Sequence, residues 1–157
     1  MFVCTGNICR SPLAEAYFRH AARRRGVEDR FYVDSSGLDA DHIGETADPR
    51  MVRTARKHGV TIDHRAKRFR PSEVKQYDLV VVMDRGHLRR LTASVADPAL
   101  SDRIVLFRDY DPRTTEPDDV PDPWYGGIAG FERVYDIVQR TVEALLDHLI
   151  ATQSATA

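Results

Sequence analysis

The first twelve residues, 1–12, are Met1-Phe2-Val3-Cys4-Thr5-Gly6-Asn7-Ile8-Cys9-Arg10-Ser11-Pro12. Phe2 and Val3 are typical of the end of a short buried strand. Ser11 is a residue type that caps helices, and Pro12 is favoured in their first turn, so a helix is expected to start here. The sequence therefore predicts a strand and a helix joined by a tight loop, with Cys4 at the carboxyl end of the strand.

Strands and helices alternate along the rest of the chain. Further strands are predicted at Phe31–Asp34, Leu79–Met83 and Ile104–Phe107. Helices are predicted at about residues 49–58 and 86–93 and, most clearly, from Phe131 to Leu149. This alternation predicts one α/β domain over residues 1–150: a four-stranded parallel sheet with helices on both faces, in a flavodoxin-like three-layer arrangement. Residues 151–157 are expected to form a frayed tail.

Composition and charge limit the classes of function. The chain has 157 residues, 23 Lys and Arg and 24 Asp and Glu, so it has no overall attraction for nucleic acid or an anionic membrane. No apolar stretch is long enough to span a membrane, and the start lacks the features of a secretory signal, so the protein is expected in the cytoplasm. Basic residues gather at 50–70 and acidic residues at 109–122, and both runs are expected to be solvated faces.

The loop after Cys4 has the features of an anion-binding site. Between a strand and a helix, its backbone N–H groups can turn inward, and the positive end of the helix adds to them. Gly6 permits a backbone turn that a side chain would block, and Arg10 provides a planar fork for two phosphoryl oxygens. The same surroundings favour a thiolate at Cys4, facing the phosphorus of a bound phosphate. For a bare Cys-x5-Arg pattern a buried structural cysteine remains the alternative, and the full string disfavours it.

A second chemical group lies far downstream, in a proline-rich connection of nearly twenty residues after Phe107. A loop this long in a compact domain is usually functional or disordered. It contains Asp122-Pro123, where the proline restricts the aspartate to extended backbone. A carboxylic acid here can protonate a leaving group and afterwards activate a water. Alone, this pair is better interpreted as a solvated turn; beside the cysteine loop, it is better interpreted as a general acid.

Together these segments resemble the low-molecular-weight protein tyrosine phosphatases. The signature of that family has Cys-x5-Arg-Ser at the amino terminus and an Asp-Pro pair followed by aromatic residues far downstream. The matching segments are Cys4–Ser11 and Asp122-Pro123-Trp124-Tyr125-Gly126-Gly127. Shorter matches are Asp34-Ser35, Asp48-Pro49-Arg50, His64-Arg65-Ala66 and Met83-Asp84. The resemblance covers nearly the whole chain.

The resemblance implies a metal-independent enzyme that hydrolyses phosphotyrosine through a phosphocysteine. Cys4 would be the nucleophile, Arg10 would bind phosphate and the transition state, and Asp122 would be the general acid. The phosphate-binding loop would comprise Thr5, Gly6, Asn7, Ile8, Cys9 and Ser11; the polar groups behind it would be Ser35 and His64; and the cleft walls would be Asp41, His42, Trp124 and Tyr125. No cofactor is implied, and no two histidines have the spacing of metal ligands.

The implied partners are phosphotyrosine-containing proteins, with phosphate and vanadate as inhibitors of a monomeric enzyme. Two positions depart from the family pattern. Asp41 stands where many members have a large aromatic residue, which makes the rim of the pocket more polar. His87 stands where an asparagine is common, and it is expected to lie away from the chemistry.

The role of Cys9 is open between two interpretations. It is either a small side chain that fills the loop, or a redox partner that captures an oxidised Cys4 as a disulfide. The second interpretation requires the two Cα atoms to lie within about 7 Å, which a curled loop can satisfy.

Three alternatives remain for the activity. Thioredoxin-coupled arsenate reductases share the fold but need two further cysteines, and this chain has none after Cys9, so arsenate reduction is largely excluded. Protein-arginine phosphatases tend to carry threonine where Ile8 stands and lack the aromatic pair after Asp-Pro, so this chain favours a flat aryl substrate. A non-catalytic phosphate-binding module is disfavoured because the nucleophile, the arginine and the general acid are all present.

Overall fold

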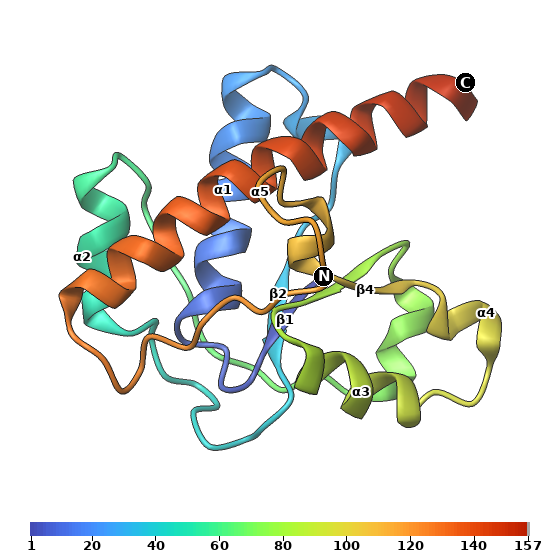
Figure 1. Ribbon diagram of the computed structural model, residues 1–157, viewed down its shortest axis with the longest axis horizontal. Coiled ribbons are helices and arrows are strands. Elements are labelled where there is room, and N and C mark those ends of the chain that lie inside the picture. The colour runs from blue at the N-terminus through green and yellow to red at the C-terminus, as the bar shows by residue number, and fades with distance from the viewer. Residues whose placement is uncertain (157) are drawn as a thin grey trace.

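The computed structural model describes residues 1–156, and its centre is a four-stranded parallel sheet (Figure 1). The strands are β1 (Phe2–Cys4), β2 (Ser35–Gly37), β3 (Val80–Val82) and β4 (Ile104–Leu106), in the order β2-β1-β3-β4. The register places Cys4 opposite Gly37 at the carboxyl edge of the sheet. Open parallel sheets carry their ligand sites at this edge.

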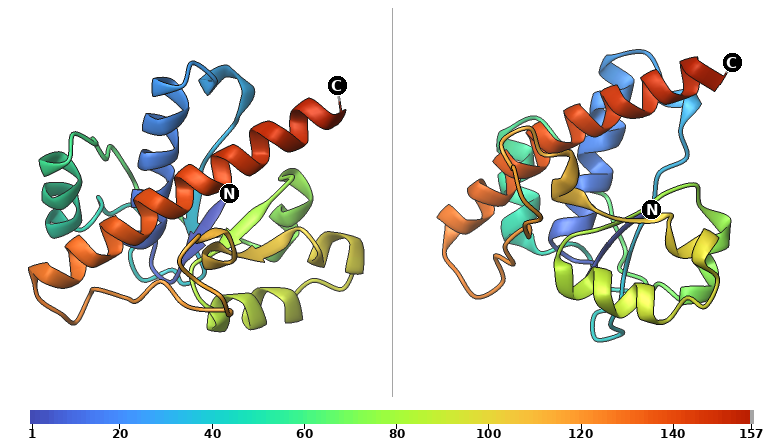
Figure 2. Two further views of the ribbon diagram at one scale, coloured as in Figure 1. Left: turned by 45° about the horizontal axis from the view of Figure 1, so that its top comes forward. Right: turned by 45° about the vertical axis from the view of Figure 1, so that its right-hand side comes forward.

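Helices cover both faces of the sheet, which confirms the predicted three-layer α/β fold. They are α1 (Arg10–Arg24), α2 (Pro49–Lys57), α3 (Arg85–Ala93), α4 (Pro98–Ser101) and α5 (Ile128–Thr156), with 3-10 turns η1 (Glu28–Arg30), η2 (Pro71–Gln76) and η3 (Phe107–Tyr110). Figure 2 shows α5 crossing α1 on one face, with α2 beside them, and α3 on the other face. The long α5 thus covers the larger core.

Two apolar cores form because neighbouring residues of a strand point to opposite faces. Phe2 and Val81 belong to the core beneath α1 and α5. Val3 and Val82 belong to the opposite core, together with Leu91 of α3. Since β3 is covered on both sides, it consists of three valines without polar alternation.

The second strand, β2, lies four residues later than the predicted Phe31–Asp34, so that prediction is wrong. β1 begins at Phe2, which pairs with Ser35, and residues 31–34 therefore lie beyond the start of β1 with no strand beside them. Phe31 packs instead against Phe18, edge to face, with ring centroids 5.4 Å apart. An apolar segment can thus serve packing without entering the sheet.

The last helix is longer than predicted. α5 continues through Thr156, so most of the segment expected to be a tail is helical, and Ala157 lies outside the described residues. Within residues 1–156 no helix combines the length and the apolar character needed to cross a membrane.

The acidic run at 109–122 differs from the solvated face that the sequence suggests. The side chain of Asp111 is fully buried and forms ion pairs with Arg108 and Arg140. Asp118 also pairs with Arg108, through an N–O distance of 2.7 Å. These charges therefore fasten the long connection between η3 and α5 to the body of the protein.

Candidate active site

Cys4 ends β1, and the loop after it leads directly into α1. The helix begins at Arg10, with Cys9 in the N-cap position and no side-chain cap, so the predicted capping role of Ser11 is wrong. The backbone N–H groups of residues 5–11 donate to no acceptor in the part of the chain that the structure describes. Unpaired donors in a loop and in a first helical turn form a binding site for an anion.

The hydroxyl of Ser11 contacts the sulfur of Cys4 instead of capping the helix. Ser11 Oγ lies 2.9 Å from Cys4 Sγ, and both residues are buried. Asn7 Nδ2 donates to the same oxygen at 2.9 Å, so the hydroxyl proton can be directed at the sulfur. Ser11 is therefore placed to donate a hydrogen bond to the Cys4 sulfur.

Asn7 fixes the shape of the loop. Its φ of 58° lies in the left-handed region, and its side chain is fully buried. Nδ2 donates to Ser35 Oγ at 3.1 Å as well as to Ser11, and Oδ1 accepts from the Lys67 N–H at 3.0 Å. The carbonyl oxygen of Asn7 lies 2.7 Å from His64 Nε2. Every polar group of the side chain is therefore used to hold one strained residue in place.

Two glycines stand where the loop leaves no room for a side chain. A Cβ on Gly6 would lie 2.8 Å from His42 Cδ2, and one on Gly37 would lie 2.8 Å from the carbonyl oxygen of Thr5. Gly6 does not have a positive φ, whereas Asn7 does. A side chain at Gly6 would thus displace the His42 ring, and the unusual backbone turn predicted at Gly6 belongs to the next residue.

Behind the loop, a glutamate that the sequence did not single out joins the predicted Ser35 and His64. Ser35 Oγ donates to Glu15 Oε2 at 2.6 Å, and His64 Nδ1 lies 4.0 Å from the same oxygen. Nothing in the pattern of α1 distinguishes Glu15 from a glutamate facing solvent. Only the pairing of β1 with β2 brings Ser35 to it, so sequence reasoning had no signal for this contact.

Arg10 is buried and held by groups that lie far apart in the sequence. Nη1 donates to Asp84 Oδ2 and to the carbonyl of Val120, both at 3.1 Å, and Nη2 donates to Thr5 Oγ1 at 3.2 Å. Nε has no acceptor in residues 1–156. The guanidinium group is therefore oriented from one side and keeps donor capacity for an oxyanion.

Asp122 approaches Arg10 from the long loop. Its Oδ2 lies 3.5 Å from Arg10 Nη2, and its side chain is 42% exposed. Oδ1 accepts from the backbone N–H of Trp124 at 3.1 Å, and Pro123 between them is buried. The carboxyl group is thus oriented by its own loop and still open to water, as a group that gives and takes protons must be.

These residues line one cavity of about 160 Å³. Its lining comprises Cys4, Thr5, Gly6, Ile8, Cys9, Arg10, Asp39, Asp41, His42, Asp122, Trp124 and Tyr125. The rings of His42 and Trp124 lie 5.5 Å apart, and Tyr125 is 92% exposed. All four residues predicted as walls therefore lie at the cavity, and Asp39 is an acidic group that the sequence did not suggest.

Cys9 is buried, and both cysteines are free thiols. Burial and the nearby carboxylate of Asp48 raise the pKa of the Cys9 thiol far above its ordinary value. Cys9 is therefore a neutral thiol at physiological pH and does not compete with Cys4 as a nucleophile. Its capture of an oxidised Cys4 stays a prediction.

His87 lies against the phosphate loop, so the expectation that it is remote from the chemistry is wrong. Its Nε2 lies 2.8 Å from Thr5 Oγ1 and 3.3 Å from Asp84 Oδ2, and both of these residues contact Arg10. Nδ1 is buried with no hydrogen-bond partner in the described residues. Burial lowers the pKa of His87 to about 4, against the opposing charge of Asp84.

Neutral His87 makes the stability of the protein dependent on pH. Its pKa is about 4 in the folded state and 6.5 without perturbation. Below pH 6.5 the unfolded chain takes up a proton that the folded chain does not, so stability falls as the pH falls towards 4. The His87→Gln variant keeps a polar group near Thr5 but cannot ionise. Between pH 7 and pH 5, we expect wild type to lose roughly 2 kcal/mol more stability than this variant.

Urea unfolding at the two pH values measures this difference. His148→Gln is the matched control, because His148 is exposed near the end of α5. We expect the control to follow the wild type. Parallel pH profiles for wild type and His87→Gln would show that the burial of His87 has no energetic effect.

The conformation of Asn7 can be tested by two substitutions. Asn7→Ala removes the buried hydrogen bonds and puts alanine, which tolerates the left-handed region less well than asparagine, at φ 58°. Asn7→Gly removes the same hydrogen bonds, and glycine adopts this φ without steric strain. We expect the alanine variant to lose about 3 kcal/mol or more of unfolding free energy, and the glycine variant to lose about 1 kcal/mol less. Denaturant unfolding measures both values. Equal stabilities would mean that the backbone shifts to relieve the strain.

Among residues 1–156 there is no group of three or more His, Cys, Asp or Glu side chains placed to hold a metal ion. The positive groups that face the cavity are Arg10 and the unpaired N–H groups of the loop.

A loop of unpaired donors around a cysteine, closed by an arginine and faced by a carboxylic acid, defines a phosphatase of the cysteine-dependent class. A family model described as low molecular weight phosphotyrosine protein phosphatase matches residues 1–155. The chain belongs to this family.

Individual relatives agree with the family model. A low molecular weight protein-tyrosine-phosphatase of Streptomyces coelicolor is 44% identical over 146 residues, which cover 92% of this chain and 89% of the relative. A protein tyrosine phosphatase from Entamoeba histolytica superposes with a TM-score of 0.91 at 32% identity, covering 97% of this chain and 96% of the other. The YwlE arginine phosphatase shares the fold with a TM-score of 0.84 at 28% identity, covering 94% and 93% of the two chains.

Proposed function

We propose that the chain hydrolyses phosphotyrosine in proteins, with Cys4 as the nucleophile, Arg10 as the phosphate-binding group and Asp122 as the general acid. One observation carries the proposal. The unpaired N–H groups of residues 5–11, the oriented guanidinium group and the open carboxyl group all surround a single cavity with the cysteine at its base. Membership of the phosphatase family supports the same reaction.

In the first step the Cys4 thiolate attacks phosphorus. The S–P bond forms while the bond from phosphorus to the tyrosyl oxygen breaks, and protonated Asp122 gives its proton to that oxygen. The tyrosine therefore leaves as a neutral phenol. The loop N–H groups and Arg10 stabilise the charge on the other three phosphoryl oxygens, which is the main contribution a protein makes to phosphoryl transfer.

In the second step water hydrolyses the phosphocysteine. Asp122, now a carboxylate, takes a proton from the water as its oxygen attacks phosphorus. The S–P bond breaks, and inorganic phosphate and the Cys4 thiolate are released. Ser11 Oγ, 2.9 Å from the sulfur, is placed to stabilise the departing thiolate. Both steps are complete without a metal ion, so activity is expected to survive chelation.

The walls of the cleft favour an aryl phosphate over a phosphoarginine. The rings of Trp124 and His42 line the cavity 5.5 Å apart, and Ile8 of the loop adds an apolar side chain to the lining. Arginine phosphatase activity is the second candidate, since YwlE shares the fold. The aromatic pair Trp124-Tyr125 is the observation that favours phosphotyrosine, because both residues line the cavity, where the ring of a tyrosyl group can pack against them.

We also propose the substrates, the inhibitors, the oligomeric state and the location of the enzyme. The substrates are phosphotyrosine-containing proteins, and phosphate and vanadate compete for the loop N–H groups and Arg10. We propose that the enzyme acts as a cytoplasmic monomer, with residues 1–150 as its catalytic domain. Its net charge of −1 supports neither nucleic acid nor an anionic membrane as a partner.

Substitution of Asp122 tests the assignment of the general acid. Asp122→Asn cannot protonate a leaving oxygen, so we expect kcat for phosphotyrosine to fall by about 10²-fold or more. For an aryl phosphate with a strongly acidic phenol, which leaves without a proton, the loss should be much smaller. Steady-state kinetics over a series of phenols measures the dependence on leaving-group pKa.

Glu116→Gln is the matched control, because Glu116 is an exposed acid in the same loop with no ion pair in the described residues. It should keep the wild-type dependence on the leaving group. If Asp122→Asn loses the same factor for every phenol, another group is the acid.

A further inference from the structure

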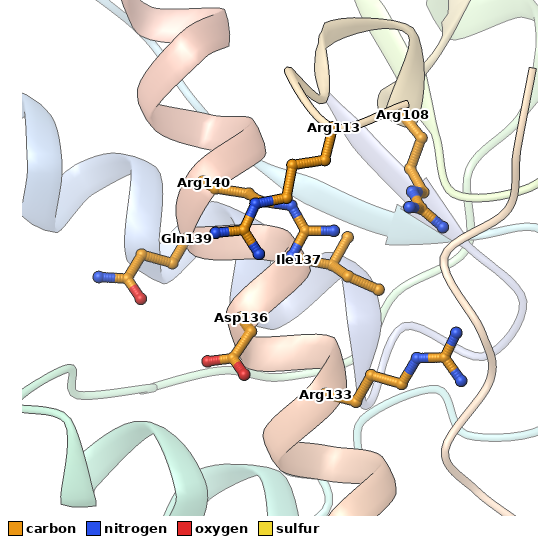
Figure 3. A pocket seen from close by; sticks show the side chains of 7 residues that line it. All are labelled: Arg108, Arg113, Arg133, Asp136, Ile137, Gln139 and Arg140. Atoms are coloured by element: carbon orange, nitrogen blue, oxygen red, sulfur yellow. The ribbon is translucent and has the colours of Figure 1, made fainter. Parts of the chain in front are cut away.

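A second cavity, of about 380 Å³, lies beside α5 and shares no residue with the catalytic cleft. Its lining is dominated by four arginines: Arg108, Arg113, Arg133 and Arg140. Figure 3 shows these side chains around α5, with Ile137 among them. Asp136 is the one carboxylate in the lining, and in this view it points away from Arg133.

Two of the arginines are fixed by a buried aspartate. The side chain of Asp111 is fully buried and accepts from Arg140 Nε at 2.9 Å and Nη2 at 3.0 Å, and from Arg108 Nε at 3.2 Å. Arg108 also donates to Asp118 at 2.7 Å. These guanidinium groups are therefore oriented before any ligand arrives, which lowers the entropic cost of binding.

The other two arginines have no carboxylate partner among residues 1–156. Arg113 and Arg133 are exposed, and their side chains form no hydrogen bond or ion pair with any of residues 1–156. Nη1 of Arg140 is also without an acceptor in these residues. Asp136 supplies one negative charge, so the wall of the cavity keeps positive charge that the protein does not neutralise. A concave surface of one sign concentrates its field on a ligand of the opposite sign.

We propose that this cavity binds a small polyanion that contains two or three linked phosphate groups, through Arg113, Arg133 and Arg140. The planar fork of arginine matches phosphate oxygens, and three forks in different parts of the wall match several phosphates better than one. The volume falls within the range of small-molecule sites. Ile137 is the one apolar side chain of the lining, so the site makes no demand for an aromatic or lipid group.

The cavity is linked to the catalytic loop by a short chain of contacts. Arg108 donates to the carbonyl of Asp119 at 2.9 Å, and the carbonyl of the next residue, Val120, accepts from Arg10 at 3.1 Å. A polyanion bound by Arg113, Arg133 and Arg140 would lie beside Arg108, which contacts the segment that leads to Asp122. This gives the site a position from which it can influence the general acid.

Titration of ¹⁵N-labelled protein with inorganic tripolyphosphate, followed by amide shifts at constant ionic strength, tests the proposal. We expect residues 134–140 to shift with their own dissociation constant, separate from residues 5–11, which report on the catalytic loop. In Arg113→Ala/Arg133→Ala the constant from residues 134–140 should weaken by at least about tenfold, because charged hydrogen bonds are lost. The constant from residues 5–11 should stay unchanged.

Arg56→Ala is the matched control, since Arg56 is an exposed arginine of α2 that takes part in no ion pair within the described residues. It should leave both constants unchanged. The proposal is overturned if the shifts are confined to residues 5–11, if the double variant binds at residues 134–140 as tightly as wild type, or if sodium chloride at equal ionic strength produces the same shifts.

Discussion

Cys4→Ser is expected to lower kcat for any phosphate ester by at least about 10⁴-fold, because a serine hydroxyl is not ionised at neutral pH and cannot attack phosphorus. The loss should be the same for good and poor leaving groups, since the bond-forming step itself is removed. The loop N–H groups and Arg10 are untouched, so phosphate should still bind. Single-turnover kinetics and calorimetric titration with phosphate measure the two properties separately.

Phosphate binding that is retained by Cys4→Ser is the internal control for this variant. A protein that neither turns over nor binds phosphate has lost the loop, and the experiment then says nothing about the nucleophile; near-UV circular dichroism identifies that case. Turnover within about tenfold of wild type would mean that Cys4 is not the attacking group. Trapping of tyrosine-phosphorylated proteins by Cys4→Ser would also identify substrates.

Arg10→Lys has the second largest expected effect, a loss of about 10³-fold in kcat. A lysine ammonium keeps the charge, but it is a point donor and cannot reproduce the planar fork. The wild-type guanidinium also contacts Asp84, Val120 and Thr5 at 3.1–3.2 Å, and a lysine of similar length cannot satisfy all three. The Val120 contact holds the loop that carries Asp122, so the proton transfer should suffer together with phosphate binding.

Steady-state kinetics separates substrate binding by Arg10 from stabilisation of the transition state by Arg10. If Arg10 only attracts the substrate, KM rises and kcat stays unchanged; if it stabilises the transition state, kcat falls. Arg23→Lys is a suitable control, because Arg23 lies on the same helix with its guanidinium group paired to Glu28 at the surface. A kcat for Arg10→Lys close to that of the control would remove Arg10 from the chemistry.

Much of the fold could be predicted because its signals are local. The valines of β3, the proline at the start of α2 and the apolar spacing of α5 each depend on neighbouring residues only. The misplaced strand at residues 31–34 shows the limit. Its composition suited a strand, but strand position is decided by what lies alongside, and β1 is only three residues long.

The candidate site divides in the same way. Cys4, Arg10 and Asp122 could be named from motifs, and the structure brings them to one cavity. Glu15 and Asp39 could not be named, because the sequence around each is typical of an exposed surface and each reaches the site only through tertiary packing. His87 was misjudged for the same reason: its contact with Thr5 spans 82 residues of sequence.

The parallel sheet has a further consequence for the order in which the enzyme acquires its reactivity during folding. The contacts that shape the loop join Asn7 to residues near 35 and 67, and Arg10 to Asp84 and to Val120, 110 residues away. Pairings of such long sequence separation form slowly, because the chain must lose loop entropy before they contribute stability. Partly folded chains therefore lack the contacts that shape the loop around Cys4. The loop is complete only once these distant contacts have formed, and a partly folded molecule carries the cysteine without the proposed site around it.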